Sequence, residues 1–242
     1  MQLKFSIAAD STRCSTCMLG DICLPLGMSQ TEVNKLDSLV TERIRVPKGM
    51  ALFKMDDPVV AVYGVRSGSL KTQIQDASGQ IQITGFRLPG EIVGMDGLDE
   101  QRQLSEAVAL EDTEVCVIGV DNMDALAIHL PILQRRFRRL MSQEITRSHQ
   151  MLLSVGTLRS EQRLAAFLLN LSQRMVALGY SPKEFLLRMT REEIGNYLGL
   201  TLETVSRLFS RFARESLIRV KQREVYIIDM PALRALSGSD CG

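Results

Sequence analysis

Three of the five cysteines in this 242-residue chain lie within ten residues, where Cys14, Cys17 and Cys23 have the spacing C-x2-C-x5-C. A fourth, Cys116, lies far along the chain, and Cys241 is next to last. We expect a cytoplasmic protein, in which thiols stay reduced and structural disulfides are rare. Four thiolates are the usual ligands of an iron–sulfur cluster, and they also suit zinc. The spacing alone leaves both kinds of centre open.

A second group of residues has the chemistry to read double-stranded DNA. Glu203, Ser206 and Arg207 are spaced i, i+3 and i+4, so a helix places them on one face. Glutamate can accept from cytosine, arginine can bind guanine through two hydrogen bonds, and serine can serve either role. An exposed ion pair between Glu203 and Arg207 is the alternative interpretation. The opposite face is expected to enter the core through Leu202, Val205 and Leu208.

The surrounding elements predict a winged helix-turn-helix. A short helix over 190–197 begins with Thr190 and Glu193 in capping-box spacing, a turn follows at 198–200, and Thr201 caps a second helix that ends near residue 214. Alternating residues over 217–221 and 224–229 predict a hairpin. The start of the second helix in such a motif enters the major groove. Four cations are candidate phosphate contacts: Arg191, Arg211, Arg214 and Lys221.

The positions that precede this motif predict a long helix, because no glycine or second proline interrupts residues 131–155. Met141, Ile145, Ser148, Leu152 and Val155 follow one another at +4, +3, +4 and +3, which is typical of a coiled-coil seam. We therefore expect a homodimer that pairs along this seam. The alternative is that the stripe packs on the chain's own β domain.

Residues 50–120 change period, with short alternating segments at 61–65, 69–74, 80–86 and 115–120 between turn signals. They predict an antiparallel barrel or sandwich. The expected fold is α+β, with a cysteine-rich segment (1–29), a β-roll domain (30–130), a dimerisation helix (131–157) and a winged helix-turn-helix domain (158–242).

Composition and charge agree with a globular protein whose second half binds a polyanion. The chain is 45% hydrophobic and 24% charged, and no apolar run approaches the ~18 residues of a membrane span. Residues 1–130 carry 11 Lys and Arg against 18 Asp and Glu, whereas residues 131–242 carry 18 against 10. We expect the basic second half to bind nucleic acid and no part to bind a membrane.

Several blocks together resemble one family, the FNR-type (fumarate and nitrate reduction) oxygen-responsive regulators of the CRP/FNR superfamily. The resemblance runs over nearly the whole chain. Its parts are the cysteine triplet, QITGF at 82–86, the long helix, EQRLAAFLLNLS at 161–172 and MTREEIGNYLGLTLETVSR at 189–207. The last two blocks are highly specific, and the cysteine spacing is an independent mark.

This resemblance implies that Cys14, Cys17, Cys23 and Cys116 hold one oxygen-labile 4Fe–4S cluster per subunit, whereas Cys241 matches no ligand position. It further implies a β-roll like that of cyclic-nucleotide-binding domains, contact with RNA polymerase and activation of anaerobic genes. The implied target is a palindrome like TTGAT-N4-ATCAA. Ile22, beside Cys23, is expected either to shield the cluster or to pack on the barrel.

Two departures from superfamily patterns refine these expectations. Nucleotide-binding relatives carry an Arg-Ser pair after a Gly-Glu turn, but here Gly90-Glu91 is followed by QRQLS at 101–105, so we expect no cyclic nucleotide. Ser148 stands where relatives often carry an acid that opposes dimerisation, so the clusterless chain should keep more dimer. Arg138 repels its own copy unless it reaches an acid such as Glu144 of the partner subunit.

An iron–sulfur or zinc enzyme with an accessory DNA-binding domain is the rival interpretation. The sequence shows no pairing of a nucleophile with a base, and the two histidines, His129 and His149, have no nearby ligand partners. We therefore expect a regulator and not an enzyme.

Overall fold

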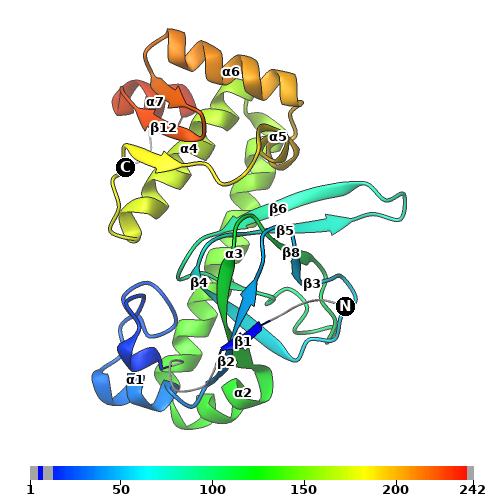
Figure 1. Cartoon of the computed structure of the whole chain (residues 1–242), viewed down its shortest axis with the longest axis vertical. Helices are drawn as coiled ribbons and strands as arrows, with labels where there is room; N and C mark the ends of the chain where they lie inside the picture. The colour runs from blue at the N-terminus through cyan, green and yellow to red at the C-terminus, as the bar shows by residue number, and fades with distance from the viewer. Residues whose placement is uncertain (1–4, 8–12, 239–242) are drawn as a thin grey trace. The chain divides into compact units, whose positions relative to one another are not determined.

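The computed structural model describes residues 5–7 and 13–238, and the chain divides into two compact units, Met1–Thr146 and Arg147–Gly242 (Figure 1). The first unit is built on antiparallel strands and the second on helices with a small sheet. No helix in the described part of the chain is both long and apolar enough to cross a membrane.

Two antiparallel sheets form the first unit. The five-stranded sheet has the order β1 (Phe5–Ile7), β2 (Val40–Val46), β9 (Thr113–Gly119), β4 (Ala61–Ser67) and β7 (Ile92–Val93). The four-stranded sheet has the order β3 (Ala51–Phe53), β8 (Glu106–Ala109), β5 (Leu70–Gln75) and β6 (Ile81–Arg87). Val46 and Val115 of the first sheet share one buried cluster with Leu52 and Leu70 of the second. The expected antiparallel β-roll is therefore confirmed.

Helices cover the end of the five-stranded sheet. They are the 3-10 helix η2 (Cys14–Thr16), α1 (Gln30–Leu36), α2 (Val120–His129) and α3 (Pro131–Thr157). Ser29 and Glu32 form a capping box at the start of α1. Proline suits the first position of α3, where a backbone N–H would have no helical partner.

The long helix α3 has two different faces. Leu133, Arg136 and Leu140 are buried, and the two leucines join a core cluster with residues of α1, α2 and the sheet. Met141, Ile145 and the later seam positions lie on another stripe and are exposed. The residues that pack on the β-roll are therefore not those of the predicted seam.

The second unit is a winged helix-turn-helix, as the sequence predicted. Its elements are α4 (Ser160–Ala177), β10 (Glu184–Leu186), α5 (Arg191–Leu198), α6 (Leu202–Arg214), β11 (Ile218–Lys221), β12 (Glu224–Ile227) and α7 (Met230–Ser237). The wing has three strands in the order β10-β12-β11, where the sequence predicted two. Neither β10 nor α7 was predicted. Leu168, Ile194 and Phe212 are fully or almost fully buried in its core.

A partly buried ion pair fastens α3 to β6. Arg87 donates from Nη1 to Oε2 of Glu144 at 2.6 Å and from Nη2 to Oε1. The Arg87 side chain is 10% exposed and that of Glu144 is 31% exposed. Glu144, which the sequence suggested as a partner for Arg138 of a second subunit, is therefore already paired with Arg87 of its own chain.

We predict that Glu144→Gln lowers the free energy of unfolding by about 1–3 kcal/mol, because it leaves a nearly buried guanidinium without its countercharge. Urea unfolding followed by circular dichroism measures the change. Arg45→Gln is the matched control, because Arg45 and Asp112 pair at 3.5 Å with both side chains about 60% exposed. The control should change stability by less than about 0.5 kcal/mol. Equal losses for the two variants would contradict the prediction.

Candidate functional site

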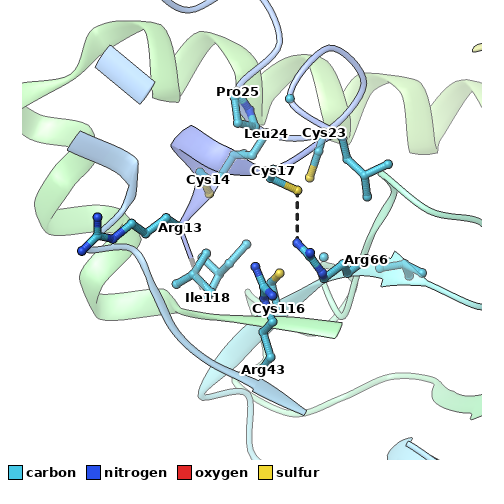
Figure 2. A pocket seen from close by; sticks show the side chains of 15 residues that line it. Arg13, Cys14, Cys17, Cys23, Leu24, Pro25, Arg43, Arg66, Cys116 and Ile118 are labelled. Atoms are coloured by element: carbon cyan, nitrogen blue, oxygen red, sulfur yellow. Dashed lines mark hydrogen bonds between the residues drawn. The ribbon is translucent and has the colours of Figure 1, made fainter. Parts of the chain in front are cut away.

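The four cysteines that resemble cluster ligands line one pocket of the first unit (Figure 2). Cys14 and Cys17 come from η2 and its end, Cys23 from the turn that follows, and Cys116 from β9. The pocket has an empty volume of about 460 Å³, including space open to solvent. Its apolar lining consists of Leu19, Leu24, Pro25, Val40, Val65 and Ile118.

Local hydrogen bonds hold the cysteine loop in a compact turn. The N–H of Cys17 donates to the carbonyl of Cys14 at 3.1 Å, and the N–H of Cys23 donates to that of Leu19 at 2.8 Å. Ser15 then ties the loop to the end of α1, because its N–H and hydroxyl both donate to the Asp37 carboxylate, at 2.9 and 2.6 Å.

The loop is also tied to the long helix. Nη2 of Arg136 in α3 donates to the carbonyls of Ile22 and Cys23 at 3.1 and 3.0 Å. The Ile22 side chain packs toward Gly90, where an added Cβ would lie 2.8 Å from its terminal carbons. Ile22 therefore packs on the barrel and does not line the pocket.

Strand register places Cys116 at the floor of this pocket. Cys116 lies opposite Arg43 of β2 and Gly64 of β4. A Cβ at residue 64 would lie 3.9 Å from the Sγ of Cys23 and from the Cβ of Cys116. The missing side chain of Gly64 thus leaves room between two of the thiols.

Three arginines at the pocket were missed by the sequence interpretation. Arg13, Arg43 and Arg66 contribute to its lining (Figure 2). Nη1 of Arg66 donates to the Sγ of Cys17 at 3.5 Å, and its Nε pairs with Glu114 at 3.0 Å. Arg43 reaches the same carboxylate at 3.6 Å. Arg13 directly precedes Cys14 in the sequence, whereas only the pairing of distant strands brings Arg43 and Arg66 to the pocket, so no sequence spacing could reveal these two.

Burial makes the thiols of this pocket weak acids when no metal is bound. Burial first, and then the neighbouring Cys23 and Cys116, raise the pKa of Cys14 to about 12. Burial likewise raises the pKa of Cys23 to about 11, although a hydrogen bond from the Leu24 N–H acts against it. The pKa of Cys116 is raised by the same cause. A bound metal centre would convert such thiols to thiolates.

The donor set fits a polynuclear group better than a single ion. Zinc holds four sulfurs at about 2.3 Å from one point. Within residues 13–238, no three His, Cys, Asp or Glu side chains converge closely enough to hold one metal ion. Four cysteines around a larger apolar pocket match the thiolate complement of a 4Fe–4S cluster, in which the ligands attach to different irons.

The helix-turn-helix is shaped by caps and by a tight turn. Thr190 and Glu193 form the predicted capping box, with bonds of 3.1 and 2.7 Å. Gly199 ends α5 at φ +65°, a conformation that favours glycine. A Cβ at Gly195 would lie only 2.6 Å from the carbonyl oxygen of Leu200, so the turn packs directly on α5. The hydroxyl of Thr201 accepts from the N–H of Thr204 at 3.2 Å and starts α6.

The predicted base-reading residues are exposed on α6. Glu203, Ser206 and Arg207 are all exposed, whereas Val205 and Leu208 are buried as expected. Leu202 is 46% exposed, so its assignment to the core is wrong, because it lies at the first helical position and projects beyond the packed face. Hydrogen bonds from the Glu203 N–H and from Thr201, with the charge of Arg207, lower the pKa of Glu203.

Two of the four candidate phosphate contacts are engaged within the unit. The Arg191 guanidinium lies over the Phe209 ring, 3.1 Å from its centroid, and burial lowers its pKa to about 10. Arg211 pairs with Glu161 at 2.6 Å and with Glu215 at 2.7 Å. Arg214 and Lys221 are exposed.

The segment at 101–105, where the sequence lacks an Arg-Ser pair, forms backbone bonds with the neighbouring loop at 56–58. Gln103 is almost fully buried, and its backbone pairs with Asp57 at 2.8 Å and Asp56 at 2.9 Å. Arg102 is exposed and its backbone bridges Pro58.

We predict that Cys14 and Cys23 of the metal-free protein react slowly with iodoacetamide at pH 8. The thiolate is the nucleophile, and a shift of the Cys23 pKa from 9.0 to about 11 lowers the thiolate fraction about 100-fold at this pH. Between pH 9 and 11, Cys14 and Cys23 keep protons in the folded state that they release in the unfolded chain. The free energy of unfolding should therefore fall as the pH rises through this range. Mass spectrometry of alkylated peptides follows the rates. Native rates that level off near pH 9 would contradict the prediction.

Comparison with known proteins identifies the family. Residues 162–236 match the Crp-like helix-turn-helix domain, and residues 43–129 match the cyclic nucleotide-binding domain. The transcriptional regulatory protein btr of Bordetella pertussis is 65% identical over 240 residues, which covers 99% of each chain. The transcriptional activator protein Anr of Pseudomonas protegens is 45% identical over 231 residues, which covers 96% of this chain and 95% of Anr.

A solved structure agrees with these relatives. FixK2 from Bradyrhizobium japonicum superimposes with a TM-score of 0.75 at 26% identity, over 82% of this chain and 98% of FixK2. The two sequence relatives are transcription regulators, and this chain is likewise a regulator and not an enzyme. The chain therefore belongs to the FNR-type transcription regulators of the CRP/FNR superfamily.

Proposed function

We propose that this regulator senses oxygen through a 4Fe–4S cluster and mainly activates anaerobic genes. The observation that carries the proposal is one apolar pocket, next to α3, in which the triplet Cys14, Cys17 and Cys23 meets Cys116 from a distant part of the sequence. The proposed location is the cytoplasm, where the thiols stay reduced and DNA and RNA polymerase are present. We propose no cyclic nucleotide ligand, because the Arg-Ser pair is missing from 101–105.

The residues of the pocket each have a task in this proposal. The four cysteines would hold the cluster, which when bound supplies a redox centre that oxygen can convert. Arg43 and Arg66 place positive charge beside the thiols and offset the negative charge of four thiolates. Arg136 joins the loop that carries Cys23 to α3 by two hydrogen bonds. A change in the loop would therefore reach α3 directly.

The exposed stripe of α3 supports a homodimer. Met141, Ile145 and Leu152 are 40%, 56% and 72% exposed, although they are apolar and follow heptad spacing. Burial of such side chains favours pairing with a second copy. Ser148 carries no charge on this stripe, so two copies avoid the repulsion that two carboxylates would create. The clusterless protein would thus keep more dimer than a relative with an acid there.

The exposed face of α6 supports base reading. Glu203, Ser206 and Arg207 would enter the major groove, with the ionised Glu203 as an acceptor and Arg207 as a paired donor to guanine. Two subunits would present two such faces to a palindrome like TTGAT-N4-ATCAA. Contact with RNA polymerase would complete activation.

We predict that Ala at any one of Cys14, Cys17, Cys23 or Cys116 abolishes the cluster, because each ligand thiolate is needed to fill the coordination of one iron. Iron and acid-labile sulfide are measured on anaerobically purified protein. Cys241→Ala is the matched control and should retain both; Cys241 itself lies outside the described residues. An intact cluster in Cys116→Ala would remove that residue from the ligand set.

We predict that Arg207→Ala weakens specific DNA binding by about 1–3 kcal/mol, the range for one good paired base contact. Glu203→Ala should mainly relax base choice at one half-site position. Arg214→Ala is the control, because it removes an exposed cation at the far end of α6 and should weaken specific and random DNA equally. Gel-shift titrations on both DNAs give the ratio. An unchanged ratio for Arg207→Ala would exclude base reading by that residue.

A further inference from the structure

One arginine of the second unit binds the ends of two helices at once. Arg163 of α4 donates from Nη2 to the carbonyl of Val155 at 2.6 Å and from Nε to that of Leu158 at 3.0 Å. Its Nη1 donates to the carbonyl of Leu198 at 3.0 Å. Val155 lies in the last turn of α3, Leu158 follows that helix, and Leu198 is the last residue of α5.

The chemistry of helix ends explains this arrangement. The last carbonyls of a helix have no partner within it and carry the negative end of the helix dipole. A guanidinium has five donors in a fixed planar fork, so it can satisfy several carbonyls in one plane. Lysine is a compact charge on a flexible stem and does not reproduce that geometry. Arg163 therefore joins α3 to α5 in a way that few side chains could.

The same junction lies next to the recognition helix. A Cβ at Gly199 would lie 3.4 Å from Nη1 of Arg163 and 3.6 Å from Cγ1 of Val155, so the end of α3 packs on the turn before α6. Glu161, also in the first turn of α4, pairs with Arg211 of α6 at 2.6 Å. The start of α4 thus holds the end of α3, the end of α5 and the recognition helix together.

We propose that Arg163 is a positioning residue that fixes α6 relative to the end of α3 and thereby sets the half-site spacing read by the dimer. This inference rests on the proposed dimer and palindrome. The α3 helices of two subunits would carry the two recognition helices, which must match half-sites about one helical turn apart. One added base pair moves a half-site by roughly 3.4 Å and rotates it about the DNA axis. A rigid junction cannot follow that change, whereas a loosened one can.

The test compares the affinity of each protein for DNA sites that differ only in the spacing between the two half-sites. Anaerobically purified wild-type protein, Arg163→Gln and Arg163→Lys are titrated on three duplexes whose TTGAT and ATCAA half-sites are separated by N3, N4 or N5. Arg234→Gln is the matched control, since it removes one exposed cation of the same unit. Wild type and control should prefer N4 by about 10-fold or more, comparable to the effect of a mismatched base pair. Arg163→Gln should reduce the preference to about twofold, and Arg163→Lys should lie between.

The outcomes separate this proposal from the function on which it rests. A spacing ratio in Arg163→Gln equal to wild type, or an equal loss of affinity on all three duplexes, would overturn the positioning role alone. Wild-type protein that does not discriminate among the three duplexes would overturn both the positioning role and the proposed palindrome. Circular dichroism checks the fold of each variant. If Arg163→Gln fails to fold, the test uses Arg163→Lys, and the ratio of its affinities for the N4 duplex and the other two duplexes shows whether the positioning role holds.

Discussion

The hydrogen bonds between the cysteine loop and the long helix α3 come from one buried cation, Arg136. Its side chain enters from α3, the residue is 7% exposed, and it donates to the carbonyls of Ile22 and Cys23. Burial lowers its pKa, and the nearby Cys23 acts in the opposite direction. A buried cation is costly without a countercharge. The thiolates of the proposed cluster would provide that charge, so cluster and helix would stabilise each other.

The helix α3, which Arg136 joins to the cysteine loop, also contacts other parts of the chain. Its inner face is held to the β-roll by Leu133 and Leu140, and by the pair between Arg87 and Glu144. Its other stripe leaves apolar residues exposed in heptad spacing, as a dimer would require. Its last turn belongs to the DNA-binding unit, where Arg163 donates a hydrogen bond to the carbonyl of Val155. In the proposed function, this one helix would therefore take part in sensing, in pairing and in DNA reading.

Periodicity and caps predicted the elements well where their signals are local. The β-roll, the long helix and the helix-turn-helix followed from alternation, uninterrupted helical residues and the Thr190 capping box. Helical period alone assigned Leu202 to the core, although this residue stands at the first position of α6 and is 46% exposed. The strand β10 has three residues, too few for a period to be seen.

The candidate site was predictable only in part. The cysteines stood out by type and spacing, and the family resemblance added Cys116. The cations around them depend on tertiary contacts, since Arg43 meets Cys116 through strand register and Arg136 reaches the loop from more than a hundred residues away. For the same reason, the pair that Glu144 forms with Arg87 within the chain could not be predicted from the sequence.

The central claim is that a cluster held by the four cysteines controls DNA binding. The most direct measurement determines iron, acid-labile sulfide and specific DNA affinity on one anaerobic sample, before and after exposure to air. The account predicts about four iron and four sulfide atoms per chain, with specific affinity that falls as they are lost. A colourless zinc protein, or specific binding that stays unchanged while iron and sulfide disappear, would contradict it.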